Sequence, residues 1–174
     1  MTGDDSDPAN GSESTASLWT ALLADARAIA QEYREDGWDA VVLEPTDVAP
    51  IDSEERVGLD VTVSADEYGV AAGLIEDGDV TITAADVYYR PLAEAGSDQR
   101  IALAAERDDD SKTAILIPLA YDITAVRPVF ETALLEDQLL VHVLADPDDG
   151  WVSFSHDDPS LFLEEADVRA WNAE

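Results

Sequence analysis

The feature that most constrains this chain is an apolar run at residues 113–121, which carries hydrophobic side chains on both faces of an expected strand. Such a strand is central in its sheet, and we expect helices to cover at least part of each face. Pro118 removes one backbone donor from the middle of the run, so we expect a bulge, an early end near Ile117, or one unpaired side. The run thus predicts a buried sheet with one local interruption.

Periodic patterns on both sides of this run predict an α+β domain. Residues 57–63 alternate between apolar and polar side chains, as in a half-buried strand, and hairpins are expected across the acidic turns at 108–111 and 146–150. We predict two layers, in which a mixed, mostly antiparallel sheet of six or seven strands is packed by three main helices. The helices are expected at residues 15–36, 65–76 and 125–137.

Two segments are expected to lack regular structure. Residues 1–13 are polar and acidic, which predicts a disordered tail ahead of a single domain at residues 14–174. Residues 45–56 contain two prolines and a cluster of charges, and they are expected to form a loop.

The start of the third helix depends on Pro128. Proline has no amide hydrogen to donate and fits only in the first turn of a helix. We therefore expect Thr124 or Ala125 to cap this helix, rather than Asp122.

The charge of the chain points to its environment. Its 40 acidic residues outnumber 9 basic ones, which gives a net charge of −31, and Lys112 is the only lysine. Carboxylates interrupt every segment instead of gathering in a tail or a patch. At molar salt the Debye length falls to about 3 Å, which screens their mutual repulsion. The pattern predicts a halophilic protein, and the lack of a basic stripe argues against nucleic-acid binding.

Several classes of function lack support in the sequence. The chain has no cysteine, which excludes disulfides and thiolate catalysis. It has no run of 18 apolar residues and no export leader, so we expect a cytoplasmic protein with no membrane partner. No GxGxxG, GxxxxGK[ST] or GxSxG motif is present, and we expect no cofactor. The acidic turns lack EF-hand spacing and are expected to be solvated, with no bound metal.

The two histidines are the first candidates for chemistry. His142 and His156 lie on the two strands of the last expected hairpin. A turn that pairs residues near 146 and 150 would place both side chains on one face, roughly 7–8 Å apart. With Asp157 or Asp158 nearby, they could form a metal or acid–base site. The structural alternative is a partly buried histidine whose ring bonds a carboxylate or a carbonyl.

Weaker candidates lie at the ends of two expected strands. Asp122 could be a catalytic acid or a metal ligand, or it could simply bond the first turn of the following helix. Tyr121 and Arg127, on either side of it, are candidates for ligand binding. Arg90 follows two tyrosines and could anchor an anionic ligand.

Two segments carry a resemblance to a known family. The sequences YDITAVRPVFETALLED (residues 121–137) and VSFSHDDPSLFL (residues 152–163) resemble an uncharacterised family of small acidic α/β proteins from haloarchaea. The resemblance covers roughly residues 15–165. It implies a halophilic α/β protein and carries no assigned activity.

We therefore predict a cytoplasmic module without catalytic activity, which binds a protein or a small molecule. The alternative is a small metal-assisted hydrolase that uses His142, His156 and nearby aspartates. Convergence of both imidazoles and a carboxylate in one pocket would favour the enzyme.

Overall fold

The computed structural model describes residues 10–77, 80–90, 98–146, 148, 150–163 and 165–172. The helices are α1 (Asn10–Glu35), α2 (Ala65–Ala72), α3 (Ile123–Glu136) and α4 (Glu165–Asn172), with a π-helix, η2 (Gly73–Asp77), and a 3-10 helix, η4 (Pro159–Phe162). The strands are β1 (Asp39–Val42), β2 (Asp47–Asp52), β3 (Val57–Thr62), β4 (Ala84–Arg90), β5 (Gln99–Asp108), β6 (Thr113–Asp122), β7 (Leu139–Leu144) and β8 (Val152–His156).

The strands form two sheets of four, where one sheet of six or seven was expected. Sheet A has the order β1-β6-β5-β4, and sheet B has the order β2-β3-β7-β8. The pairs β1–β6 and β3–β7 are parallel, and the other neighbouring pairs are antiparallel. The α+β class and the mixed, mostly antiparallel pairing are confirmed, whereas the single sheet was wrong.

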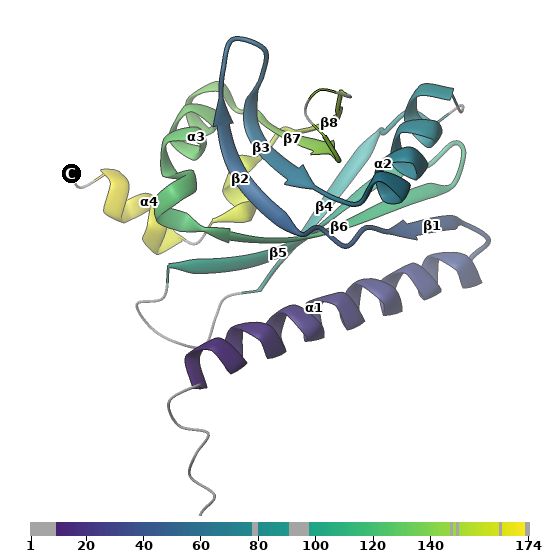
Figure 1. The fold of residues 1–174 in the computed structure, drawn as a ribbon, viewed down its shortest axis with the longest axis horizontal. Coiled ribbons are helices and arrows are strands. Elements are labelled where there is room, and N and C mark those ends of the chain that lie inside the picture. Colours follow the sequence, from purple (N-terminus) through teal and green to yellow (C-terminus); the bar gives the residue numbers. More distant parts are fainter. Residues whose placement is uncertain are drawn as a thin grey trace, which may run out of the picture.

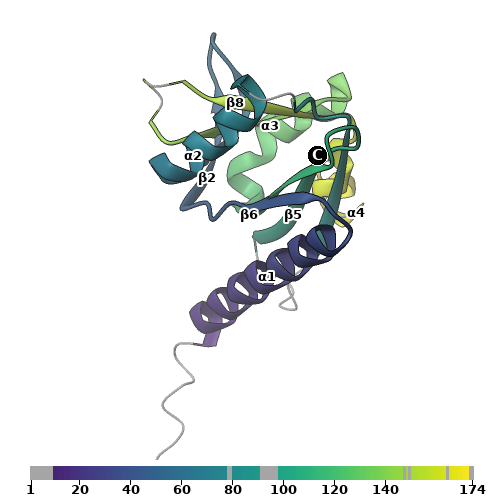
Figure 2. The ribbon, with the colours of Figure 1, turned by 90° about the vertical axis from the view of Figure 1, so that its right-hand side faces the viewer.

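The two faces of β6 explain the layering. Ile115, Ile117 and Leu119 belong to the main core, which is shared with sheet B and α3. Ala114 and Leu116 face the other way and pack with α1 in a second core. Figures 1 and 2 show α1 along the outside of sheet A, with sheet B on the opposite side. The prediction of a central strand covered on both faces is confirmed, but one cover is a second sheet, so the two-layer prediction was wrong.

Pro118 lies where β6 has a partner on one side only. Leu43 N donates to Leu116 O, so the backbone groups of Leu116 point toward β1. Because these directions alternate along a strand, the nitrogen of Pro118 also points to that side. The pairing with β1 ends at Leu116, while Pro118 stays in register with Leu103 of β5. The expected unpaired side is confirmed, without a break in the strand.

Two expected boundaries were wrong in the first third of the chain. Helix α1 begins at Asn10, inside the expected tail, and residues 1–9 lie outside the described part of the chain. Residues 47–52 form β2 rather than a loop. In the part of the chain that the structure describes, this strand lies at the edge of sheet B with β3 as its one neighbour. Pro50 can therefore lie in it without removing an amide that a second neighbour needs.

The cap of α3 also differs from the prediction. Asp122 is the N-cap, and its Oδ1 accepts hydrogen bonds from Thr124 N at 2.8 Å and Ala125 N at 3.0 Å. Pro128 consequently lies inside the helix, where Thr124 O has no amide hydrogen to accept four residues later. The cap, worth about 1 kcal/mol, and the burial of apolar residues such as Phe130 offset this loss.

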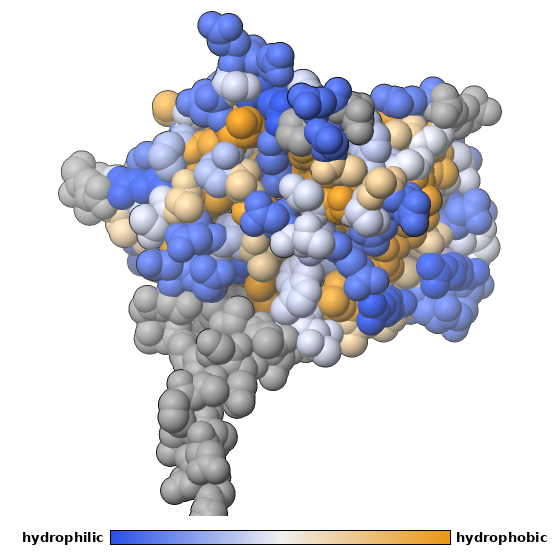
Figure 3. Space-filling model, in the orientation of Figure 1, coloured by the Kyte–Doolittle hydropathy of each residue, from blue (hydrophilic) through white to orange (hydrophobic). Residues whose placement is uncertain are grey.

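Hydrophilic residues are spread across the face of the molecule shown in Figure 3, with apolar side chains between them. None of the described helices is long and apolar enough to cross a membrane.

Candidate functional site

The register of the β7–β8 hairpin separates the two histidines. His142 pairs with Ser153, and His156 pairs with Leu139. The true register is one residue away from the predicted one, and such a shift moves a side chain to the other face of the sheet. His142 therefore lies on the outer face of sheet B and His156 on the inner face. The predicted constellation of two histidines on one face was wrong.

His156 meets a carboxylate of the other sheet. Its Nε2 lies 2.7 Å from Glu106 Oε2, and the two residues are 4% and 0% exposed. Glu106 follows Ala102 and Ala104 on the face of β5 that is turned toward sheet B. The ring of Phe162 packs edge-on against the imidazole at 5.1 Å. A polar pair thus joins sheet A to sheet B within an apolar core.

The carboxylate of Glu106 is only half satisfied. Its Oε1 is buried and has no hydrogen-bond partner among the residues that the structure describes. Most buried polar atoms in proteins have a partner, so an unpaired carboxylate oxygen in a core calls for a specific explanation. Sequence reasoning missed Glu106, although a charged residue on the alternation of Ala102 and Ala104 is itself a signal.

A cleft of about 350 Å³ opens next to this pair. One wall is formed by residues 82–85, at the start of β4, and the other by residues 155–158 at the end of β8, together with Leu161. His156 lines the cleft, and Ala85 of the opposite wall pairs with Glu106 in the sheet. His156 therefore faces a polar cleft between the edges of the two sheets, and Glu106 is buried next to it in the core.

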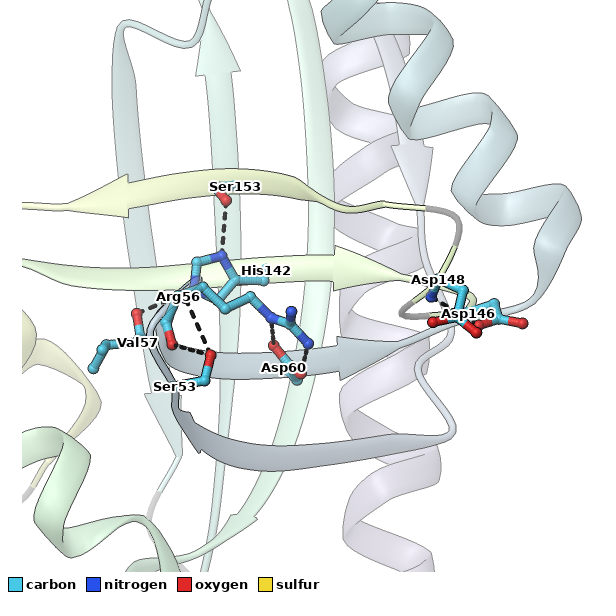
Figure 4. Close-up of polar contacts among 8 residues, drawn as sticks. All are labelled: Ser53, Arg56, Val57, Asp60, His142, Asp146, Asp148 and Ser153. Carbon is cyan, nitrogen blue, oxygen red and sulfur yellow. Dashed lines mark hydrogen bonds and ion pairs between the residues drawn. The ribbon is translucent and has the colours of Figure 1, made fainter.

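His142 is held in a different environment on the outer face of sheet B. Its Nδ1 lies 2.7 Å from Ser153 Oγ and its Nε2 lies 3.1 Å from Val57 O, so each ring nitrogen has a protein partner (Figure 4). Arg56 makes two bonds to Asp60, at 2.8 and 2.5 Å, beside the imidazole. With 1% of its surface exposed, His142 fits the structural alternative, since neither nitrogen is left for a ligand.

The buried imidazole of His142 predicts that the stability of the fold depends on pH. Burial lowers the pKa of His142 below its usual 6.5, although the bond to Val57 O opposes the shift. The unfolded chain then binds more protons than the folded one between the lowered pKa and 6.5. Stability is therefore lost as the pH falls through this window, by at most about 1.4 kcal/mol per pH unit.

Urea unfolding between pH 7.5 and 5 in molar KCl measures this slope. His142→Gln, whose amide can still donate to Val57 O, is expected to unfold with a shallower pH dependence than the wild type. Equal slopes in the two proteins would contradict the assignment.

The remaining candidates take structural positions or are not described. Asp122 caps α3, as shown above. Tyr121 is buried and its hydroxyl donates to Phe162 O at 2.5 Å. Arg127 lies 3.4 Å from Glu131 and stacks over the ring of Trp171. The side chain of Arg90 lies outside what the structure describes.

The two acidic turns differ from each other. Asp146 and Asp148 are exposed, and Asp146 Oδ1 accepts from Asp148 N at 2.9 Å, which confirms a solvated turn (Figure 4). The prediction of a solvated turn was wrong for Asp108, which is 2% exposed. Its carboxylate accepts hydrogen bonds from Thr81 N and, within its own turn, from Asp110 N and Ser111 Oγ. These bonds, that from Thr81 first, lower the pKa of Asp108. Within the described residues, no group of three or more His, Asp or Glu side chains could hold a metal ion.

These observations define an α+β protein of two packed sheets, with a buried Glu–His pair beside a cleft. The model of a family of unknown function, DUF7529, matches residues 6–164, and the chain belongs to this family. No curated protein and no solved structure matches it. The predicted membership of an uncharacterised family is confirmed, while the haloarchaeal origin stays a prediction.

Proposed function

We propose that this protein is a non-catalytic module that binds a small ligand in the cleft at His156. The observation that carries the proposal is the carboxylate of Glu106, which is fully buried and bonds the imidazole that lines the cleft. Its other oxygen has no hydrogen-bond partner among the described residues. Removing two ionisable groups from water costs several kcal/mol, so a pair of this kind is weak evidence for a purely stabilising role. Its position at a cleft supports a binding role.

A fragment screen followed by NMR tests this function. Ligands that bind in the cleft are expected to shift the imidazole signals of His156 and the amide signal of Ala85, and to raise the melting temperature. A ligand at 100 times its Kd stabilises a folded protein by about 2.7 kcal/mol.

Two variants show where a ligand binds. The double variant Glu106→Leu/His156→Phe keeps an apolar core but removes the polar pair, and it should lose the ligand response. His142→Gln changes the other histidine and should keep it. A screen of neutral, anionic and cationic fragments that gives no signal at His156 would refute the function.

We also propose that the module works in a salt-rich cytoplasm. The support is the net charge of −31 on a chain with a single lysine. The midpoint of thermal unfolding is expected to rise steeply from dilute buffer to molar KCl, because salt screens the repulsion between carboxylates. An unfolding midpoint that does not change with KCl concentration would contradict this adaptation.

A hydrolase remains the second candidate, supported by one specific contact. Glu106 orients His156 at 2.7 Å, which is the arrangement of a general base and its orienting carboxylate. The metal-assisted form with both histidines loses its ligand set, because His142 lies on the other face of sheet B. Turnover of small ester substrates that is lost in His156→Gln and kept in His142→Gln would favour the enzyme over the binding module.

A further inference from the structure

The charged side chains that face the cleft at His156 are carboxylates. The charged side chains among its described lining residues are Asp157 and Asp158, both exposed, and neither lysine nor arginine lines it. Arg107 is the next residue after Glu106, but it points to the other face of β5 and pairs with Asp86 and Asp109. A ligand in this cleft therefore meets a negative potential.

The inner end of the cleft offers one acceptor atom, on His156, with the carboxylate of Glu106 buried next to it. The carboxylate of Glu106 accepts the hydrogen bond from Nε2 of His156, and in the tautomer with the proton on Nε2 the other nitrogen, Nδ1, is an acceptor. No hydrogen bond joins Nδ1 to any residue in the described part of the chain. Glu106 does not itself line the cleft, and its Oε1 is buried without a hydrogen-bond partner among the described residues. An acceptor nitrogen beside a buried carboxylate calls for a ligand group that combines N–H donors with a positive charge.

Each wall of the cleft carries apolar side chains beside the polar residues Thr83 and Ser155. Ile82, Ala84 and Ala85 lie on one side, and Leu161, which is 45% exposed, lies on the other. Methylene groups placed between these walls would lose their contact with water, which favours binding. The volume of about 350 Å³ is at the low end for ligand sites and suits a short chain.

We infer that this cleft binds a small primary alkylammonium ion, whose alkyl stem lies between Ile82 and Leu161 and whose charge is matched by the Glu106–His156 pair and Asp157. The inference rests on the proposed binding function and names the ligand class. An ammonium group supplies three hydrogen-bond donors and a positive charge. At molar KCl, K⁺ competes with it for the carboxylates. The alkyl stem distinguishes the two ions, because only the alkylammonium ion gains from contact with the apolar side chains of the walls.

The test uses butylammonium, butyrate and 1-butanol, which share one chain length and differ in charge. Titration in molar KCl, followed by the His156 imidazole and Ala85 amide signals, is expected to saturate with butylammonium and not with butyrate. Lengthening the probe from ethylammonium to butylammonium should tighten binding by about three- to fourfold per methylene. Butyrate binding as tightly as butylammonium, or a lack of saturation by butylammonium, would overturn the ligand class.

Two single variants separate a site from general attraction to an acidic protein. Asp157→Asn removes a rim charge, whereas Asp148→Asn removes an exposed charge from the turn at the opposite end of β8. Neither carboxylate makes a side-chain hydrogen bond within the described residues, so both variants should fold. Asp157→Asn is expected to weaken butylammonium binding, and Asp148→Asn should leave it unchanged. Equal weakening by both would refute the site.

The results also distinguish the ligand class from the function itself. If butylammonium fails while a neutral or anionic fragment shifts His156, the inference is wrong and the binding function stands. If nothing shifts His156, both are wrong.

Discussion

Replacing Gly58 by alanine is expected to destabilise the fold by about 2–6 kcal/mol, the combined cost of backbone strain and a steric clash. Gly58 has a φ of +144°, which side chains with a Cβ rarely adopt, and an added Cβ would lie 2.2 Å from Leu140 O. The glycine allows the backbone of β3 to approach β7 closely. Urea unfolding in molar KCl measures the loss of free energy.

Two other glycines separate the two causes. Gly37 has a φ of +90° with nothing within 4 Å of an added Cβ, so Gly37→Ala should show the cost of strain alone, about 1–3 kcal/mol. Gly69 lies inside α2 with open space around it, and Gly69→Ala should stabilise the protein by about 0.5–1 kcal/mol. If Gly58→Ala costs no more than Gly37→Ala, the close approach to Leu140 is not what requires glycine.

Removing one member of the buried pair should have the second large effect. Glu106→Leu leaves His156 buried without its carboxylate, and breaking such a pair costs about 3–5 kcal/mol. His156→Phe should be similarly costly, because it leaves the buried carboxylate of Glu106 with no described partner for either oxygen. The free energy of unfolding at neutral pH, in molar KCl, is the measurement.

The double variant should recover most of this loss. Apolar residues of similar volume often replace a buried ion pair at little cost or with a gain in stability. Glu106→Leu/His156→Phe is therefore expected to be much more stable than either single variant, with a large coupling energy in the cycle. Additive losses would show that the two side chains do not act as a pair. Recovery of stability without recovery of ligand binding would separate the functional role from the structural one.

The sequence predicted elements better than it predicted how they meet. The apolar run at 113–121 correctly predicted a central strand, β6. Pro118 correctly predicted that this strand has an unpaired side, which begins where the pairing with β1 ends. The same alternation of apolar residues cannot assign strands to one sheet or to two, because both arrangements bury the same faces. Strand β2 was not predicted because it contains Pro50. A proline is compatible with a strand at the edge of a sheet, but which strand lies at the edge is known only once the sheet has assembled.

The predicted site with both histidines was wrong because the register of the β7–β8 hairpin was wrong by one residue. A hairpin turn that is one residue different moves His142 from the face of His156 to the opposite face, and composition alone does not fix the turn. His156 was identified from its rarity, but its partner Glu106 lies far away in the chain, on another sheet. Local spacing could not have joined them. Asp122 became the cap of α3 because its two hydrogen bonds and the burial of the helix outweigh the preference of Pro128 for a first turn.

The parallel pairing of β3 with β7 bears on how the chain folds. Leu59 meets Val141, so sheet B cannot close until the ribosome has produced most of the chain. The antiparallel strands β4, β5 and β6 follow one another directly and can pair early. Contacts between distant segments slow folding, because the connecting chain must lose entropy first. We expect nascent or truncated chains to populate a partly folded state in which strands β4, β5 and β6 are paired and the edge of β3 that binds β7 is not. This state is the one most prone to aggregation.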